Sequence, residues 1–176
     1  MEHNDDFVLL GRDDLKDFNE ANILPESKIT LEQIRKWLQL TAYDLDGGEY
    51  RKHLASHMKG TGIWMTDTET YKQWHDGVTH GTLWLKGIPG SGKSVFAASL
   101  TDQLVRERVP VFYFFFRQII DANHEPRALL RDWLVQILAF SAPLQVQLAK
   151  LIDARRQLDS LSMDDLWRYL RLALSH

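Results

Sequence analysis

The feature that most constrains this chain is an eight-residue glycine-rich stretch at 87–94, which reads GIPGSGKS and fits the pattern G-x-x-x-x-G-K-[ST]. A short apolar run at 82–86 precedes it, and an apolar helical pattern begins at Val95. A strand, a glycine loop and a helix in this order are the context that a phosphate-binding loop requires. The sequence therefore predicts such a loop, in preference to a glycine-rich turn that only links a strand to a helix.

The residue types of this loop suit a ligand with several closely spaced negative charges. Glycines remove Cβ atoms and permit positive φ, so main-chain N–H groups can converge on phosphate oxygens. The start of the following helix adds unpaired N–H groups and the positive end of its dipole. Lys93 would reach the β and γ phosphates, Ser94 would ligate Mg²⁺, and Pro89 would stiffen the loop. The candidate nucleotide-binding residues are Gly87, Ile88, Pro89, Gly90, Ser91, Gly92, Lys93, Ser94 and Val95.

The residues around the loop predict an α/β fold. We expect a helix from the loop to about Arg108, followed by a strand at 111–116, because the continuous apolar run VFYFFF is typical of a strand buried on both faces. The helix is long enough to serve as the crossover between two parallel strands, which gives one βαβ unit over about 82–116. Two strands form only a marginal sheet, so this architecture looks cut short.

Helical patterns occupy most of the remaining chain. Signals for helix starts occur at Thr30 with Gln33, Thr66 with Glu69, Pro126, and Ser162 with Asp165. Further helices are expected at 50–58 and, after a break at 141–143, at 144–152. The first of these two carries His53 and His57 one turn apart, a spacing that can bind a metal. We interpret both as surface histidines, because the sequence offers no third ligand.

Composition limits the classes of function. The chain has 176 residues, a net charge of −3 and no cysteine, which excludes disulfides and thiolate metal sites. No apolar stretch is as long as a membrane span, no signal peptide opens the chain, and no basic surface suggests a nucleic-acid or membrane partner. We therefore expect a cytoplasmic protein. An acid-rich stretch at 1–24 is expected to be a mobile arm, followed by a helical lead-in at 25–80 and the P-loop domain from 81 to 176.

A second acidic element is expected in a P-loop NTPase, as an apolar strand that ends in Asp or Glu. The second predicted strand is followed by Arg117, and Asp121 comes several residues later. We favour a surface position for both, although Asp121 could reach the site and Arg117 could point at phosphate from the end of its strand. No catalytic residue is assigned.

Several stretches together resemble a known family: GTGIWMT at 60–66, Tyr71, Trp74, LWLKGIPGSGKS at 83–94 and FFFRQ at 114–118. They resemble fungal NACHT-type proteins, the nephrocystin-like N-terminal P-loop domains of NOD-like receptor relatives within the STAND class of signalling NTPases. The resemblance covers about residues 25–175. It implies a three-layer α/β P-loop NTPase fold that binds ATP or GTP with Mg²⁺, with Lys93 on the β and γ phosphates and Ser94 on the metal.

The resemblance also implies a role. Such proteins act as nucleotide-controlled switches that rest with a bound diphosphate, oligomerise with a triphosphate, and are linked to self/non-self recognition and cell death. Family members continue into an acidic Walker B strand, which lies between the two strands predicted here. This chain stops before that strand is due, so we expect residues 81–176 to be the N-terminal part of such a domain, in a fragment of a larger protein.

Three hypotheses on function remain at this point. The first is a nucleotide-binding signalling NTPase module. The second is a non-enzymatic interaction module with a vestigial P-loop, which would dock a partner or a second copy through the helices that carry Trp37, Trp133 and Trp167. The third, a small-molecule kinase, is disfavoured because we find no arginine-rich lid. The sequence does not decide between ATP and GTP.

Overall fold

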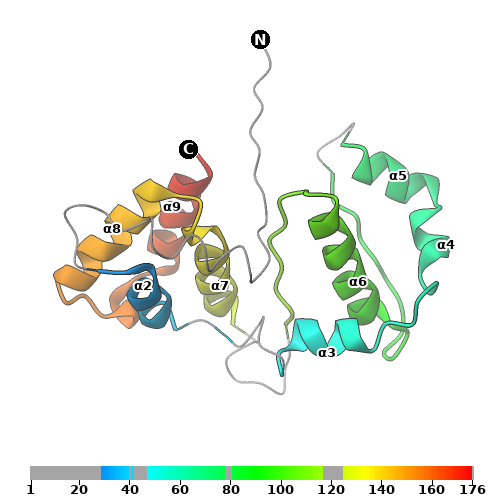
Figure 1. Ribbon diagram of the computed structural model, residues 1–176, viewed down its shortest axis with the longest axis horizontal. Coiled ribbons are helices and arrows are strands. Elements are labelled where there is room, and N and C mark those ends of the chain that lie inside the picture. Colours follow the sequence, from blue (N-terminus) through cyan, green and yellow to red (C-terminus); the bar gives the residue numbers. More distant parts are fainter. Residues whose placement is uncertain (1–28, 40, 42–46, 78–80, 117–124, 176) are drawn as a thin grey trace, which may run out of the picture.

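The computed structural model describes residues 29–39, 41, 47–77, 81–116 and 125–175, and the statements below concern these residues. The predicted arm at 1–24 lies outside them. The regular elements are α2 (Leu31–Trp37), α3 (Glu49–Ala55), α4 (Ile63–Thr66), α5 (Glu69–His75), α6 (Lys93–Arg106), α7 (Pro126–Leu138), α8 (Ala142–Asp153), a 3₁₀ turn η2 (Leu158–Ser160) and α9 (Met163–Leu174). Figure 1 shows α2, α7, α8 and α9 gathered on one side and α3 to α6 on the other.

The expected α/β fold is wrong. The described part of the chain contains helices and no strand, so neither the βαβ unit nor a three-layer P-loop NTPase fold is present there. A strand requires a neighbouring strand to satisfy its main-chain groups, and the segments at 82–86 and 111–116 run along different sides of α6 (Figure 1). They are also not buried on both faces, because Trp84 is 75% exposed and Phe116 is 57% exposed.

A side-chain amide takes the place of a partner strand at 111–116. The main-chain N–H of Tyr113 donates to Oε1 of Gln136 on α7 over 3.2 Å. Nε2 of Gln136 in turn donates to the carbonyl oxygen of Tyr113 over 3.0 Å. Both main-chain groups of Tyr113 are therefore satisfied without a β-ladder, which removes the cost of leaving them unpaired.

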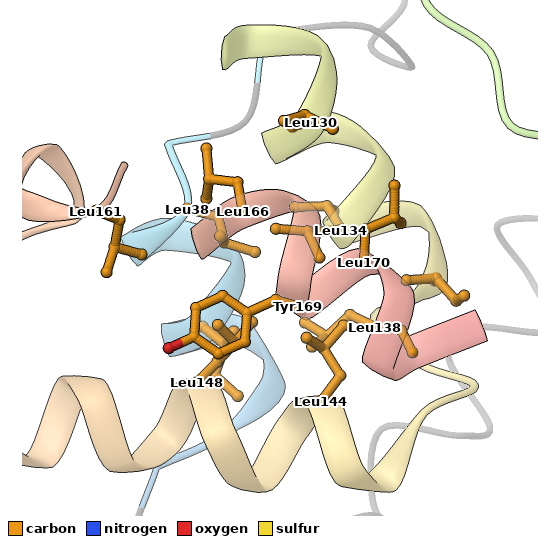
Figure 2. Packing of buried hydrophobic residues seen from close by; sticks show 14 of the residues in the cluster. Leu38, Leu130, Leu134, Leu138, Leu144, Leu148, Leu161, Leu166, Tyr169 and Leu170 are labelled. Carbon is orange, nitrogen blue, oxygen red and sulfur yellow. The ribbon is translucent and has the colours of Figure 1, made fainter. Parts of the chain in front are cut away.

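The hydrophobic core lies among α2, α7, α8 and α9 (Figure 2). Leucines from each of these helices are fully buried there, among them Leu38, Leu134, Leu138, Leu148 and Leu166. These are the apolar positions that recur at helical spacing in the sequence, so amphipathic patterning explains this half of the molecule. The 25–80 lead-in contributes to the same core through α2, which packs on α8.

Local capping signals located several helices correctly. Thr30 and Gln33 form the predicted capping box at α2, as do Ser162 and Asp165 at α9. Pro126 begins α7, as predicted. None of the helices in the described residues is long and apolar enough to span a membrane.

The capping prediction at Thr66 is wrong. Thr66 ends α4, and its hydroxyl donates to the carbonyl oxygen of Ile63 over 2.9 Å. Thr68 caps α5 instead, because its Oγ1 accepts the main-chain N–H of Tyr71. The chain thus forms two short helices, α4 and α5, where the sequence predicted a single helix that begins at Thr66.

A buried carboxylate links α7 to Thr41, which follows α2 in the chain. Asp132 on α7 is fully buried, and its Oδ1 accepts the main-chain N–H of Thr41 over 2.8 Å. Its Oδ2 accepts the hydroxyl of Thr41. Burial raises the pKa of Asp132 above its ordinary value of 3.8, although the hydrogen bonds from Thr41 oppose this shift.

We predict that Asp132→Asn changes the pH dependence of stability. A raised pKa means that Asp132 stabilises the fold most at low pH and that this contribution is lost as pH rises through the folded-state pKa. The free energy of unfolding of the wild type, relative to Asp132→Asn, should therefore increase as pH falls from 7 to 4. Urea denaturation at several pH values measures this difference.

Asp165→Asn is the matched control, because the contribution of Asp165 should not increase as pH falls from 7 to 4 and should be lost below its ordinary pKa of 3.8. Hydrogen bonds from the main chain and side chain of Ser162 lower the pKa of Asp165 below its ordinary value of 3.8. Its contribution is present above that value and lost as pH falls. Parallel trends for both variants would contradict the assignment of a raised pKa to Asp132.

Candidate functional site

The glycines of the loop at 87–94 determine the conformation of its backbone. Gly90 and Gly92 have φ of 79° and 83°, in the left-handed region that other residues avoid. Gly87 needs to be glycine for another reason, since a Cβ there would lie 2.7 Å from Oγ of Ser91. Gly90 and Gly92 thus give the loop its left-handed turns, and Gly87 leaves room for the Ser91 side chain.

Lys93 lies folded against this loop. Its Nζ donates to the carbonyl oxygens of Gly87 over 2.9 Å and Ile88 over 2.8 Å, and it lies 3.4 Å from Oγ of Ser91. The ammonium group is therefore held next to the loop, where its positive charge can meet an anion. The Ile88 side chain points away into solvent and is 77% exposed.

The loop leads directly into the start of α6. The N-cap residue is Gly92, which has no side chain to bond the first N–H groups of the helix. The first intrahelical bond runs from the N–H of Phe96 to the carbonyl of Gly92 over 2.9 Å, so the N–H groups of Lys93, Ser94 and Val95 come before it. Ser94 is exposed on this first turn. Unpaired N–H groups and the positive end of a 14-residue helix make this end attractive to anions.

A cavity of about 530 Å³ lies between the loop and the chain that connects α3 with α4. One wall comes from the loop and its neighbours, including Gly87, Ser91 and Lys93. The opposite wall, which we call the 56–65 wall, consists of Ser56, His57, Met58, Thr61, Gly62, Trp64 and Met65. The volume falls in the range of small-molecule and cofactor sites.

Gly62 brings the 56–65 wall close to α6. It has φ of 86°, and a Cβ at this position would lie 2.9 Å from Cδ2 of Phe96. Gly60 has a similar φ of 87° but has open space around it. The close approach of α4 to the first turn of α6 therefore depends on the missing side chain of Gly62.

The remaining candidate residues from the sequence are the two histidines proposed to be on the surface and two residues after the second predicted strand. Nε2 of His53 lies 3.7 Å from Oε2 of Glu49, and Nε2 of His57 lies 3.2 Å from the carbonyl oxygen of Thr61. No group of three metal-ligating side chains occurs among the described residues. Arg117 and Asp121, the two candidates beyond the second predicted strand, lie outside the described residues.

A second contact fixes α5 to the far end of α6. Nε2 of His75 lies 2.8 Å from Oε2 of Glu107, and its Nδ1 lies 3.3 Å from Oδ1 of Asp76. The hydrogen bond to Glu107 is the main cause that raises the pKa of His75 above its ordinary value of 6.5. Hydrogen bonds from Gln103 and then from His75 lower the pKa of Glu107 below its ordinary value of 4.5.

A comparison with known protein families shows which family the chain belongs to. Residues 60–176 match the family described as "Nephrocystin 3, N-terminal", a match that takes in the 87–94 loop and helices α4 to α9. The chain belongs to this family, as the residues of the loop and of the GTGIW stretch predicted.

One characterised relative is the "Vegetative incompatibility protein HET-E-1" of Podospora anserina. It is 32% identical over 88 residues, which are 49% of this chain and 6% of that relative. The expected relationship to nephrocystin- and NACHT-related proteins is confirmed. No solved structure matches the chain.

We predict that Gly62→Ala destabilises the protein more than Gly60→Ala. Both substitutions place a Cβ on a left-handed residue, which costs about 1–2 kcal/mol. Gly62→Ala also presses on the Phe96 ring, which adds about 1–3 kcal/mol of overpacking. Chemical denaturation of the two variants measures the difference, and equal losses would show that α4 does not need its close approach to α6.

We also predict that the contact between His75 and Glu107 stabilises the fold within a limited pH window. The raised pKa of His75 gives a contribution that is complete below about pH 6.5 and lost as pH rises through the folded-state pKa. The lowered pKa of Glu107 gives one that is present above about pH 4.5 and lost on acidification. The difference in Tm between the wild type and His75→Gln should therefore be largest between these values. A difference that does not change from pH 5.5 to 9 would contradict this prediction. Glu107→Gln should reduce the dependence on pH without abolishing it, because Asp76 also raises the pKa of His75.

Proposed function

We propose that this chain is a nucleotide-binding signalling module of the NACHT/STAND type, in which the 87–94 loop binds the phosphates of ATP or GTP together with Mg²⁺. The observation that carries the proposal is the conformation of the loop. Gly90 and Gly92 take positive φ, and the ammonium of Lys93 is held against the carbonyls of the same loop. The first N–H groups of α6 follow immediately.

Each residue of the loop has a role in this proposal. The N–H groups of the loop and of the first turn of α6 would donate to phosphate oxygens, except at Pro89, which has no N–H. Lys93 would add a positive charge at the outer phosphates. The exposed hydroxyl of Ser94 would be a ligand of Mg²⁺, which prefers oxygen donors and keeps several waters. When bound, the metal would neutralise part of the phosphate charge.

The proposal covers binding and assigns no residue to hydrolysis. No Asp or Glu is among the described residues that line the cavity of about 530 Å³. A phosphoryl-transfer site needs a group that orients or activates the attacking water. We therefore assign binding to this part of the chain and leave the catalytic base unassigned.

The signalling part of the proposal rests on relatedness. The relative in Podospora anserina is called a vegetative incompatibility protein, and the chain matches 6% of its length. By extension we propose that nucleotide binding here controls self-association in a response to non-self. Light scattering at a series of protein concentrations, with and without Mg·ATP, measures that step.

A helical interaction module is the second candidate. It is favoured by the wholly helical content of the described elements and by Trp167 on α9, which is 40% exposed. The two other tryptophans of this hypothesis, Trp37 and Trp133, pack against the hydrophobic core and are less accessible to a partner. In this case the loop would be vestigial.

We predict that Lys93→Ala weakens the binding of Mg·ATP and Mg·GTP by about 10- to 100-fold, because a hydrogen bond to a charged group contributes about 1.5–3 kcal/mol. Isothermal titration calorimetry measures the affinity, and far-UV circular dichroism verifies the fold. Lys150→Ala is the matched control, since it removes the same charge from an exposed position on α8.

Two results would favour the interaction module instead. The wild type could show no binding of either nucleotide, or Lys93→Ala could bind as tightly as the wild type. Multiple turnovers of ATP by the isolated chain would contradict the interaction module and would require a catalytic base.

A further inference from the structure

The proposed function leaves one side of the large cavity without a role. Phosphates held by the 87–94 loop would occupy one wall, but the 56–65 wall lines the same cavity from the opposite side. This wall contains most of the GTGIW stretch, 60–64, which the phosphate chemistry does not explain.

We propose that the 56–65 wall binds the nucleoside part of the nucleotide and that the indole of Trp64 is the platform on which the base stacks. The proposal rests on the proposed function, because it takes the position of the phosphates from the 87–94 loop. A nucleotide would then span the cavity, with its triphosphate at Lys93 and its base at Trp64.

The exposure of the apolar side chains in this wall supports a stacking role. Trp64 is 70% exposed and Met58 is 72% exposed, yet both line a cavity that contains charged Lys93. Large apolar side chains beside a polar anchor are typical of sites for ligands that have an aromatic part and a charged part. A purine attached to a triphosphate is such a ligand.

The close approach of Gly62 to Phe96 ties this platform to the phosphate loop. Phe96 lies on the first turn of α6, three residues after Lys93, and also lines the cavity. Gly62 packs on the ring of Phe96, and Trp64 is two residues further along the chain. The contact between Gly62 and Phe96 therefore sets the distance between Trp64 and the 87–94 loop.

The polar groups of the wall predict weak discrimination between bases. The hydroxyl of Ser56 donates to the carbonyl of Lys52 over 2.9 Å, and that of Thr61 donates to the carbonyl of Met58 over 2.7 Å. These protons are therefore not available to read a base edge. Stacking tolerates any base, because every base has a π-face. A platform that holds the base by stacking alone should therefore accept ATP and GTP with similar affinity.

The test compares three probes: Mg·ATP, Mg·GTP and magnesium tripolyphosphate, which has the phosphates but no nucleoside. Calorimetry on the full chain should give affinities for the two nucleotides within about threefold of each other. Trp64→Ala should weaken both nucleotides by about 10-fold or more and leave tripolyphosphate within about twofold, because a stacked base is lost. Trp64→Phe should retain much of the affinity.

Trp167→Ala is the matched control. Trp167 is an exposed tryptophan on α9, at 40%, and it does not line the cavity, whereas Trp84 is unsuitable because its ring lies 5.3 Å from Nζ of Lys86, which does. The substitution of Trp167 should leave the affinity for all three probes unchanged. Circular dichroism melts verify that each variant folds.

The outcomes separate this inference from the proposed function. Unchanged nucleotide affinity in Trp64→Ala would overturn the platform while the phosphate site stands. An equal loss of nucleotide and tripolyphosphate would also overturn it, since Trp64 would then act on the loop. A preference of more than about 30-fold for one nucleotide would overturn the weak discrimination. A wild type that binds none of the three probes would overturn the proposed function itself.

Discussion

The paired hydrogen bonds between Gln136 and the main chain of Tyr113 hold the two halves of the described structure together. Gln136 belongs to α7, in the helical core, whereas the ring of Tyr113 stacks on Tyr50 of α3 with ring centroids 4.7 Å apart. α3 in turn packs on α6, the helix that begins at the glycine loop. The segment at 111–116 therefore connects the candidate site with the leucine core, through the Gln136 amide, which satisfies a donor and an acceptor at once, and through Phe112, which packs against the core.

This contact also explains why the fold differs from the one that the sequence predicted. The run VFYFFF at 111–116 has the composition of a buried strand, and composition is a local property. Whether such a run becomes a strand depends on a second strand beside it, which is a property of the whole chain. Helices were predicted better because their signals are local. The Thr30 and Ser162 boxes satisfy main-chain groups within three residues, and Pro126 suits the first helical position because its φ is fixed and it has no N–H to leave unpaired. The buried contact between Thr41 and Asp132 spans 91 residues and left no trace in the local pattern.

The same distinction applies to the candidate site. The 87–94 side of the cavity is visible in the sequence as a candidate because its residues are contiguous, and the positive φ of Gly90 and Gly92 is what a glycine at those positions permits. The opposite wall comes from 56–65 and could not be placed, because its position depends on contact with Phe96 some 30 residues later. A signal existed, since the GTGIW stretch is among the residues that carry the resemblance to the family and lies within the matched range 60–176. Its physical reason, a glycine that lets α4 approach α6, becomes visible only in three dimensions.

The contacts of α6 suggest how events at the loop reach the rest of the molecule. Its first turn is in contact with Gly62, just before α4, and the residue after its end is held by His75 at the end of α5. The chain from 62 to 75 therefore contacts α6 at both ends.

A ligand can shift the conformation of a protein only through contacts that differ between its states. A nucleotide that joined the loop to Trp64 would form such contacts at one end of α6, where α4 packs. Because α4 and α5 are in contact with each other, a change there would act on the His75 and Glu107 pair at the other end. In the proposed function, α4 and α5 would therefore be the part of the described structure best placed to respond to a nucleotide.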